Sequence, residues 1–96
     1  MRPSEALAKH RDEVLAIIAK YPVSNARVFG SVARGEDTEG SDIDIIVDAG
    51  NGCSYYDFFR MEDDFALLLN VKVDIHTLAE FGQRMRQRVE RDMKAL

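Results

Sequence analysis

The sequence lacks several features that mark common protein classes. Tryptophan is absent, and cysteine occurs once among 96 residues. The single cysteine, Cys53, cannot form an internal disulfide, and no cysteine and histidine pairs occur at zinc-binding spacing, so we expect a reducing, cytoplasmic location. Charged residues precede the first apolar stretch, which argues against a signal peptide, and no segment approaches the roughly 20 apolar residues of a membrane span. We therefore expect no membrane partner.

An excess of positive charge is also missing. Lysine and arginine number 13 against 17 acidic residues, and the formal net charge is −4. A protein that coats nucleic acid generally has a basic surface, so we expect no direct nucleic-acid partner. Acidic residues crowd into residues 36–64, where Arg60 is the only base. Solubility explains such crowding in general, and a divalent metal site explains it more specifically.

Hydrophobic periodicity predicts the order helix, strand, strand, helix, strand, helix. The strands are expected at 26–29, 43–47 and 71–76. The helices are expected from Ser4 to about Lys20, from a capping Ser54 to Asn70, and along the C-terminal stripe of Met85, Val89, Met93 and Leu96. The predicted fold class is α/β or α+β, a small mixed three-stranded sheet flanked by helices, formed by residues 1–96 as a single domain.

The segment from Gly30 to Asp44 carries the pattern most relevant to chemistry. Asp42 and Asp44 stand two residues apart at the start of a predicted strand, so we expect both side chains on one face, about 7 Å apart at their Cα atoms. Neighbouring carboxylates suit magnesium, which takes its other ligands from water and substrate phosphates. Asp74 lies in an otherwise apolar strand, where a carboxylate is costly unless it binds something, and is the candidate third acid.

Gly30 and Ser31 follow the preceding strand and favour a phosphate cradle. A glycine lets the backbone approach a ligand, and the next backbone amides with the serine hydroxyl can donate hydrogen bonds to a phosphate. Arg34 either adds a positive charge to this cradle or pairs with a neighbouring acid such as Glu36. Ser41 either orients the loop before the aspartates or contacts the ligand directly.

Two residues beside these candidates have plainer interpretations. Asp48 is expected to cap the loop that follows its strand. His76 follows Asp74 by two residues, so it lies near the same site or is a structural residue at the strand end. The basic C-terminal helix is either a docking surface for a partner or a solvated face.

These motifs together resemble a known family. Gly30-Ser31-x-Ala33-Arg34-Gly35, followed by Ser41-Asp42-x-Asp44, is similar to the signature of the nucleotidyltransferase superfamily related to DNA polymerase β. Because the chain is small, it is most similar to the minimal nucleotidyltransferases (MNT), the antitoxin half of HEPN/MNT toxin–antitoxin pairs. The resemblance implies the nucleotidyltransferase fold, with residues 1–96 as one minimal domain.

The resemblance also implies a magnesium-dependent enzyme that transfers AMP from ATP to a tyrosine of a partner HEPN toxin. Gly30 and Ser31 would bind the nucleoside triphosphate, with Arg34 and Ser41 as further binding residues. The metal ligands and catalytic residues would be Asp42, Asp44 and Asp74, of which Asp74 would also assist the attacking hydroxyl.

The size of the chain bears on its acceptor. Three strands and a few helices can supply one nucleotide cleft but little room for a second pocket. The acceptor is therefore expected to be a docking protein, or the site is shared with another subunit of a homo-oligomer. Two alternatives stay open: an antitoxin that acts mainly as a binding module covering its toxin, with weak or no catalysis, and a transferase acting on a small molecule or nucleic acid.

Overall fold

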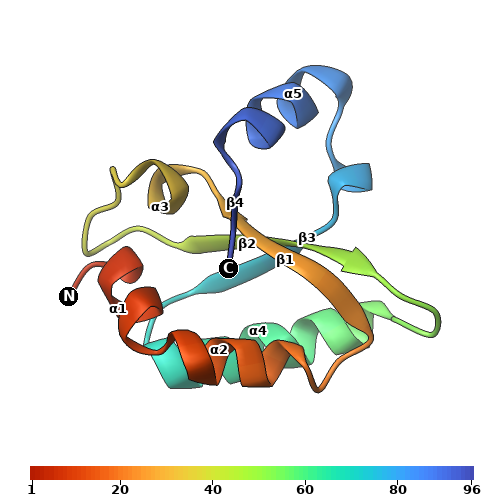
Figure 1. Cartoon of the computed structure of the whole chain (residues 1–96), viewed down its shortest axis with the longest axis horizontal. Coiled ribbons are helices and arrows are strands. Elements are labelled where there is room, and N and C mark those ends of the chain that lie inside the picture. Colours follow the sequence, from red (N-terminus) through yellow and green to blue (C-terminus); the bar gives the residue numbers. More distant parts are fainter.

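The computed structural model describes all residues from 1 to 96. In chain order the elements are α1 (Pro3–Lys9), α2 (Arg11–Ile18), β1 (Val23–Phe29), α3 (Ser31–Arg34), β2 (Ile43–Ala49), α4 (Tyr55–Leu69), β3 (Val73–His76), the short 3-10 helix η1 (Leu78–Glu80), α5 (Gln83–Asp92) and β4 (Lys94–Ala95) (Figure 1). None of the helices has the length and apolar character needed to span a bilayer.

The strands form one mixed sheet in the order β3-β2-β1-β4. β1 runs antiparallel to β2 and to β4, and β2 runs parallel to β3. The predicted fold class is confirmed, but the predicted number of strands is wrong, because the sheet has four. The predicted C-terminal helix ends early: Met93 adopts extended backbone after α5, and Leu96 N–H donates to Ala26 O at 3.0 Å.

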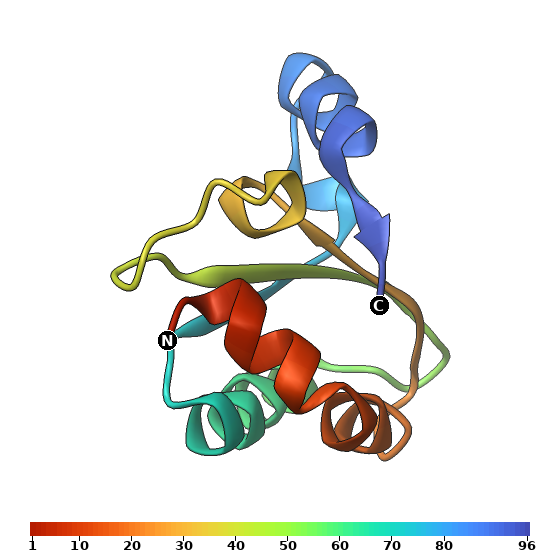
Figure 2. The same cartoon turned by 60° about the vertical axis from the view of Figure 1, so that its left-hand side comes forward.

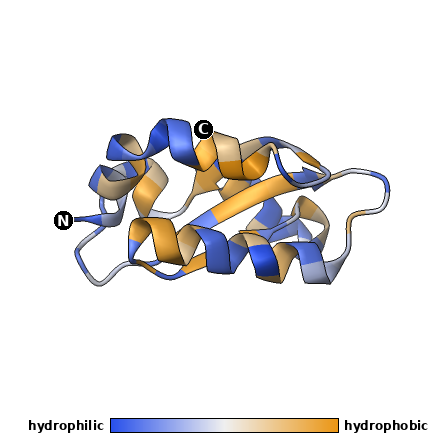
Figure 3. Cartoon of the chain, turned by 90° about the horizontal axis from the view of Figure 1, so that it is seen from below, coloured by the Kyte–Doolittle hydropathy of each residue, from blue (hydrophilic) through white to orange (hydrophobic).

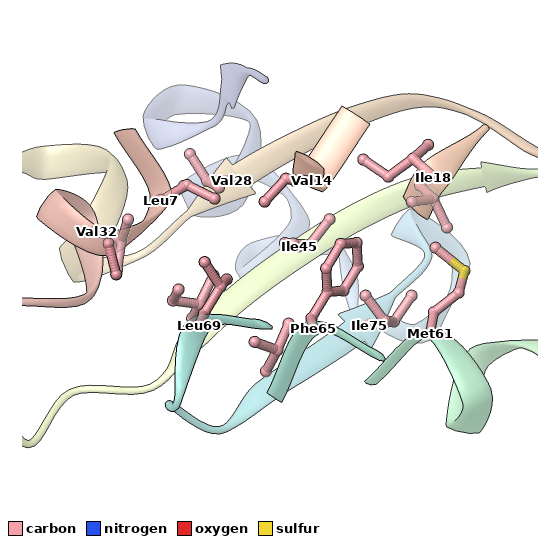
Figure 4. Close-up of a cluster of buried hydrophobic side chains, with 14 of the residues drawn as sticks. Leu7, Val14, Ile18, Val28, Val32, Ile45, Met61, Phe65, Leu69 and Ile75 are labelled. Carbon is pink, nitrogen blue, oxygen red and sulfur yellow. The ribbon is translucent and has the colours of Figure 1, made fainter. Parts of the chain in front are cut away.

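Helices α1, α2 and α4 cover one face of the sheet, and η1 and α5 lie over the other (Figures 1 and 2). Successive strand side chains point to opposite faces, so each strand serves both. In β2, Ile43, Ile45 and Val47 are at most 1% exposed. They belong to a core of 16 buried residues on the face covered by α1, α2 and α4 (Figure 4). Seen from that side, hydrophobic strand segments lie between the helices, and hydrophobic and hydrophilic residues alternate along each helix (Figure 3).

The first predicted helix is two helices, divided at His10. The first of them begins at Pro3, so Ser4 is not its cap as expected. Instead Ser4 N–H donates to the Asp37 carboxylate at 2.8 Å, and Asp37 is only 3% exposed. Burial raises the pKa of the Asp37 carboxyl, but the hydrogen bonds from Ser4, the backbone N–H of Asp37 and the charge of Arg2 together outweigh it, and the pKa lies below its ordinary value. A distant carboxylate therefore caps this helix, which no local pattern could indicate.

Helix α4 follows the sequence prediction at both ends. The Ser54 hydroxyl accepts from Asp57 N–H, and Ser54 N–H donates back to the Asp57 carboxylate at 3.0 Å, as a capping box requires. Asn70 ends the helix with a φ of 54°, in the left-handed region. The buried stripe of α4 consists of Phe58, Met61, Phe65 and Leu69, which pack against the sheet.

Candidate active site

The face of the sheet below α5 brings two predicted acids together. The parallel register of β2 and β3 places Asp44 beside Asp74 and Ile46 beside His76. Ligand atoms of Asp44, Asp74 and His76 all lie within 4.8 Å of one another, and each residue is partly buried. The predicted convergence of these acids from two separate strands is therefore found in the structure.

His76 connects this cluster to η1. Its Nε2 lies 3.1 Å from Asp44 Oδ1, and its Nδ1 lies 3.1 Å from Glu80 Oε2. The hydrogen bond to Asp44 raises the pKa of His76 to about 9, burial opposes this, and Glu80 adds to the rise. A protonated imidazole donates to both carboxylates, so the ring holds a positive charge against Asp44. The Lys72 ammonium, 3.9 Å from Asp74 Oδ2, supplies a second positive charge.

Gly30 forms a sharp bend against Asp44. Its φ of 74° and ψ of −152° lie in a region that is essentially restricted to glycine. A Cβ built at Gly30 would lie 3.8 Å from Asp44 Oδ2, so the bend runs directly past the carboxylate. Ser31 begins the single turn of α3, whose first N–H groups have no partners within the helix. The predicted cradle and the acidic cluster are therefore adjacent.

A cavity of about 290 Å³ opens beside this bend. Phe29, Gly30 and Asp44 border it from the sheet, Arg34 borders it from α3, and α5 closes it with Met85, Arg88, Val89 and Asp92. A larger cavity of about 350 Å³ lies between α1, α3 and β4, but no member of the acidic cluster borders it. The cavity below α5 is therefore the candidate site for a reacting ligand.

Asp42 does not join the cluster of ligand atoms. It is exposed and lies just before β2, which begins at Ile43. The assignment of Asp42 as a metal ligand therefore stays a prediction, whereas Asp44 and Asp74 have the geometry that it requires.

The other predicted binding residues make contacts within the protein. Arg34 donates through Nε to Glu36 at 3.1 Å and through Nη1 to Asp92 at 2.9 Å, and these carboxylates, Glu36 first, raise its pKa. The Ser41 hydroxyl accepts from Thr38 N–H at 2.9 Å and so orients the loop before the aspartates.

Asp48 has a structural role, but its partners lie in β1, whereas the sequence had indicated the loop that follows its strand. It lies on the same face of β2 as Asp44 but accepts hydrogen bonds from Asn25 at 3.2 Å and from Arg27 at 3.1 Å. These two contacts, Asn25 first, lower the pKa of its carboxyl. Arg27 is 5% exposed, so Asp48 neutralises a buried cation.

The sequence left the role of His76 undecided and did not indicate that α5 contributes residues to the cavity. The period of two in β3 indicates that His76 shares a face with Asp74, which was the available signal. Arg88 and Asp92 lie more than forty residues from Asp44 along the chain, and their place beside the cavity depends on how α5 packs.

The acidic cluster fits a magnesium ion by its chemistry. Carboxylate oxygens are the ligands that magnesium prefers, both carboxylates are only partly buried, and Asp44 borders the cavity below α5. The positive charges of His76 and Lys72 already compensate these acids, and a divalent cation would take over that compensation.

A mixed sheet with a glycine–serine bend beside paired acidic residues is the arrangement of a nucleotidyltransferase. The Nucleotidyltransferase domain family matches residues 7–96, and the chain belongs to that family. The chain is thus an enzyme of the nucleotidyltransferase class, which confirms the class predicted from its motifs.

The relatives of this chain include proteins named as protein adenylyltransferases. One from Methanocaldococcus jannaschii, provisionally so named, is 44% identical over 73 residues, which cover 76% of this chain and 81% of that protein. Protein adenylyltransferase MntA of Thermococcus cleftensis is 36% identical over 69 residues, which cover 72% of this chain and 67% of that protein.

Solved structures share the fold. A structure provisionally assigned as a minimal nucleotidyltransferase superposes with a TM-score of 0.84 at 38% identity and covers 97% of this chain and 95% of its own. An MNT antitoxin in complex with a tri-AMPylated HEPN toxin of Shewanella oneidensis has a TM-score of 0.67. It is 19% identical, covers 92% of this chain and 69% of its own, and at that identity supports the fold alone. The resemblance to minimal nucleotidyltransferases is confirmed.

Proposed function

We propose that residues 1–96 act as one minimal nucleotidyltransferase domain that transfers AMP from ATP, with magnesium, to a tyrosine of a HEPN toxin. The observation that carries this proposal is the meeting of Asp44 and Asp74 beside the bend at Gly30. The names of the relatives support a protein as the acceptor. The toxin as partner is supported by the complex of a related fold with a HEPN toxin that carries AMP groups.

The reaction is an in-line displacement at phosphorus. The tyrosine oxygen attacks the α-phosphorus, a new P–O bond forms, and the bond to the oxygen that bridges to the β-phosphorus breaks, so that pyrophosphate leaves. The hydroxyl proton passes to the Asp74 carboxylate, which is partly exposed and can reach an incoming side chain. Magnesium, when bound, would neutralise charge on the triphosphate and lower the pKa of the attacking hydroxyl.

The remaining groups of the site position the nucleotide. Asp44 and Asp74 would hold the metal, with Asp42 as a further ligand from the loop before β2. The Ser31 hydroxyl and the N–H groups of the first turn of α3 would donate hydrogen bonds to phosphate oxygens. Gly30 lets the phosphates approach, because it has no side chain between the backbone and Asp44.

The test is magnesium-dependent labelling of a co-purified HEPN toxin by ATP, followed by mass spectrometry of the toxin. Asp44→Asn keeps the shape of the side chain but removes its charge, and should slow labelling by about a hundredfold or more. Asp48→Asn is the matched control, because Asp48 lies on the same face of β2 but outside the acidic cluster, and it should label the toxin normally.

Two outcomes would contradict the proposal. Normal labelling by Asp44→Asn would exclude this carboxylate as a metal ligand. An unmodified toxin in a tight complex with the unaltered chain would instead support a binding module that neutralises its toxin by covering it.

A further inference from the structure

Helix α5 presents one stripe to the sheet. Met85, Val89 and Asp92 recur at helical spacing and border the cavity beside Asp44. Val89 is 2% exposed and packs against Phe29 and Ile46, which anchors the helix over the sheet. Figure 2 shows α5 standing above the sheet on the same side as α3. A polar residue on the edge of this stripe therefore faces the cavity.

Arg88 is that residue. It borders the cavity together with Gly30 and Asp44, although it remains solvent-exposed. The ion pairs of α5 join Asp92 to Arg34 and Arg86 to Glu90, and Arg88 takes part in neither. A long cation beside a cavity, without a carboxylate partner, is free to bind an anion.

The charges around the cavity indicate which anion. Arg34 and Arg88 face Asp44 and Asp92, so the lining side chains sum to zero charge. Arg34 is already held by Glu36 and Asp92, at 3.1 and 2.9 Å. Arg88 is thus the only bordering cation with no compensating acid. A nucleoside triphosphate lying along the bend at Gly30 brings several negative charges to this cavity, and these need a cation from the protein.

We propose that Arg88 is a nucleotide-binding residue, which reaches down from α5 to the terminal phosphates of the nucleoside triphosphate. This inference rests on the proposed function, since it takes ATP as the substrate. It adds the C-terminal helix to the site, so that the phosphates lie between the bend at Gly30 on one side and a guanidinium on the other.

The test compares the binding of ATP, ADP and AMP to the whole chain by isothermal titration calorimetry, with magnesium present and no acceptor protein. Arg88→Ala should weaken ATP binding about tenfold, the loss of one charge-assisted contact. ADP binding should weaken less, and AMP binding should not change, because AMP lacks the phosphates that Arg88 contacts. Arg88→Lys should recover part of the affinity, since it keeps the charge but not the planar fork.

Arg91→Ala is the matched control. Arg91 lies on the same helix, is exposed and forms no ion pair, but does not border the cavity. This variant should bind ATP as the unaltered chain does.

The affinity of Arg88→Ala for ATP should also depend less on sodium chloride, because one screened charge pair has been removed.

Three results would overturn the inference. In the first, Arg88→Ala binds ATP as tightly as the unaltered chain. In the second, Arg88→Ala weakens the binding of ATP and of AMP equally. In the third, Arg91→Ala weakens the binding of ATP as much as Arg88→Ala does. The first result, with normal ATP binding and toxin labelling by the unaltered chain, contradicts the role of Arg88 alone. Failure of the unaltered chain to bind ATP would contradict the proposed function as well.

Discussion

Replacement of Gly30 by alanine tests the bend on which the site depends. Gly30 has a φ of 74° and a ψ of −152°, a conformation that costs a residue with a side chain about 1–3 kcal/mol. Alanine also lowers the conformational entropy of the unfolded chain, which stabilises the folded state by about 0.4–1 kcal/mol. A steric term is small, because the nearest atom to the added Cβ is Asp44 Oδ2 at 3.8 Å. We therefore expect Gly30→Ala to lower the free energy of unfolding by about 1–2 kcal/mol.

Urea denaturation at constant pH measures this change, and two other glycines serve as graded controls. Gly35 has a φ of 72° and a ψ of 20°, in the ordinary left-handed region, so Gly35→Ala should be destabilising by about 1 kcal/mol. Gly40 has no positive φ and nothing within 4 Å of an added Cβ, so Gly40→Ala should be neutral or slightly stabilising. If Gly30→Ala and Gly40→Ala unfold at the same urea concentration, the strain assigned to the bend is absent.

Two further predictions concern single carboxylate contacts. Asp37→Ala leaves Ser4 N–H without its buried acceptor and should lower the free energy of unfolding by about 2 kcal/mol at pH 7. The folded pKa of Asp37 is depressed, so its stabilisation is complete above its unfolded value of 3.8 and is lost as pH falls through the folded pKa. The difference between variant and unaltered chain in urea should therefore shrink below pH 3.8 and not above it. His76→Gln removes the cation that magnesium must displace from Asp44, so the magnesium affinity measured by calorimetry should rise about tenfold; a fall in affinity would instead make His76 a metal ligand.

Much of the fold was predictable because its signals are local. The capping box at Ser54 and the stop at Asn70 fix both ends of α4 within a few residues of sequence. Asp74 could be grouped with Asp44 in advance because a carboxylate in an otherwise apolar strand is costly unless it binds something, and the parallel register of β2 and β3 places the two side by side. Gly30 was identifiable because a glycine at the end of a strand lets the backbone approach a ligand, whereas its positive φ was known only from the structure.

The errors arose where distant residues decide the local structure. The apolar residues Met93 and Leu96 continue the helical spacing of α5, yet the chain turns extended because Lys94–Ala95 can pair with β1. Asp37 caps α1 from across the molecule, which displaced the start predicted at Ser4. No local pattern indicates the position of Arg88 either, because its place beside the cavity depends on the packing of α5 against the sheet.

The two faces of the sheet divide folding from chemistry, and this makes site variants interpretable. The face below α1, α2 and α4 holds a core of 16 buried residues, whereas the face below α5 holds a cluster of three: Phe29, Ile46 and Val89. Because burial of apolar surface supplies most of the stabilisation, the first face carries the fold. Substitutions at Asp44, Asp74 or Arg88 remove polar side chains from the second face and leave that core in place. Helix α5 has Val89 as its one buried residue and rests on the smaller cluster, so its local opening should cost less free energy than opening of the main core.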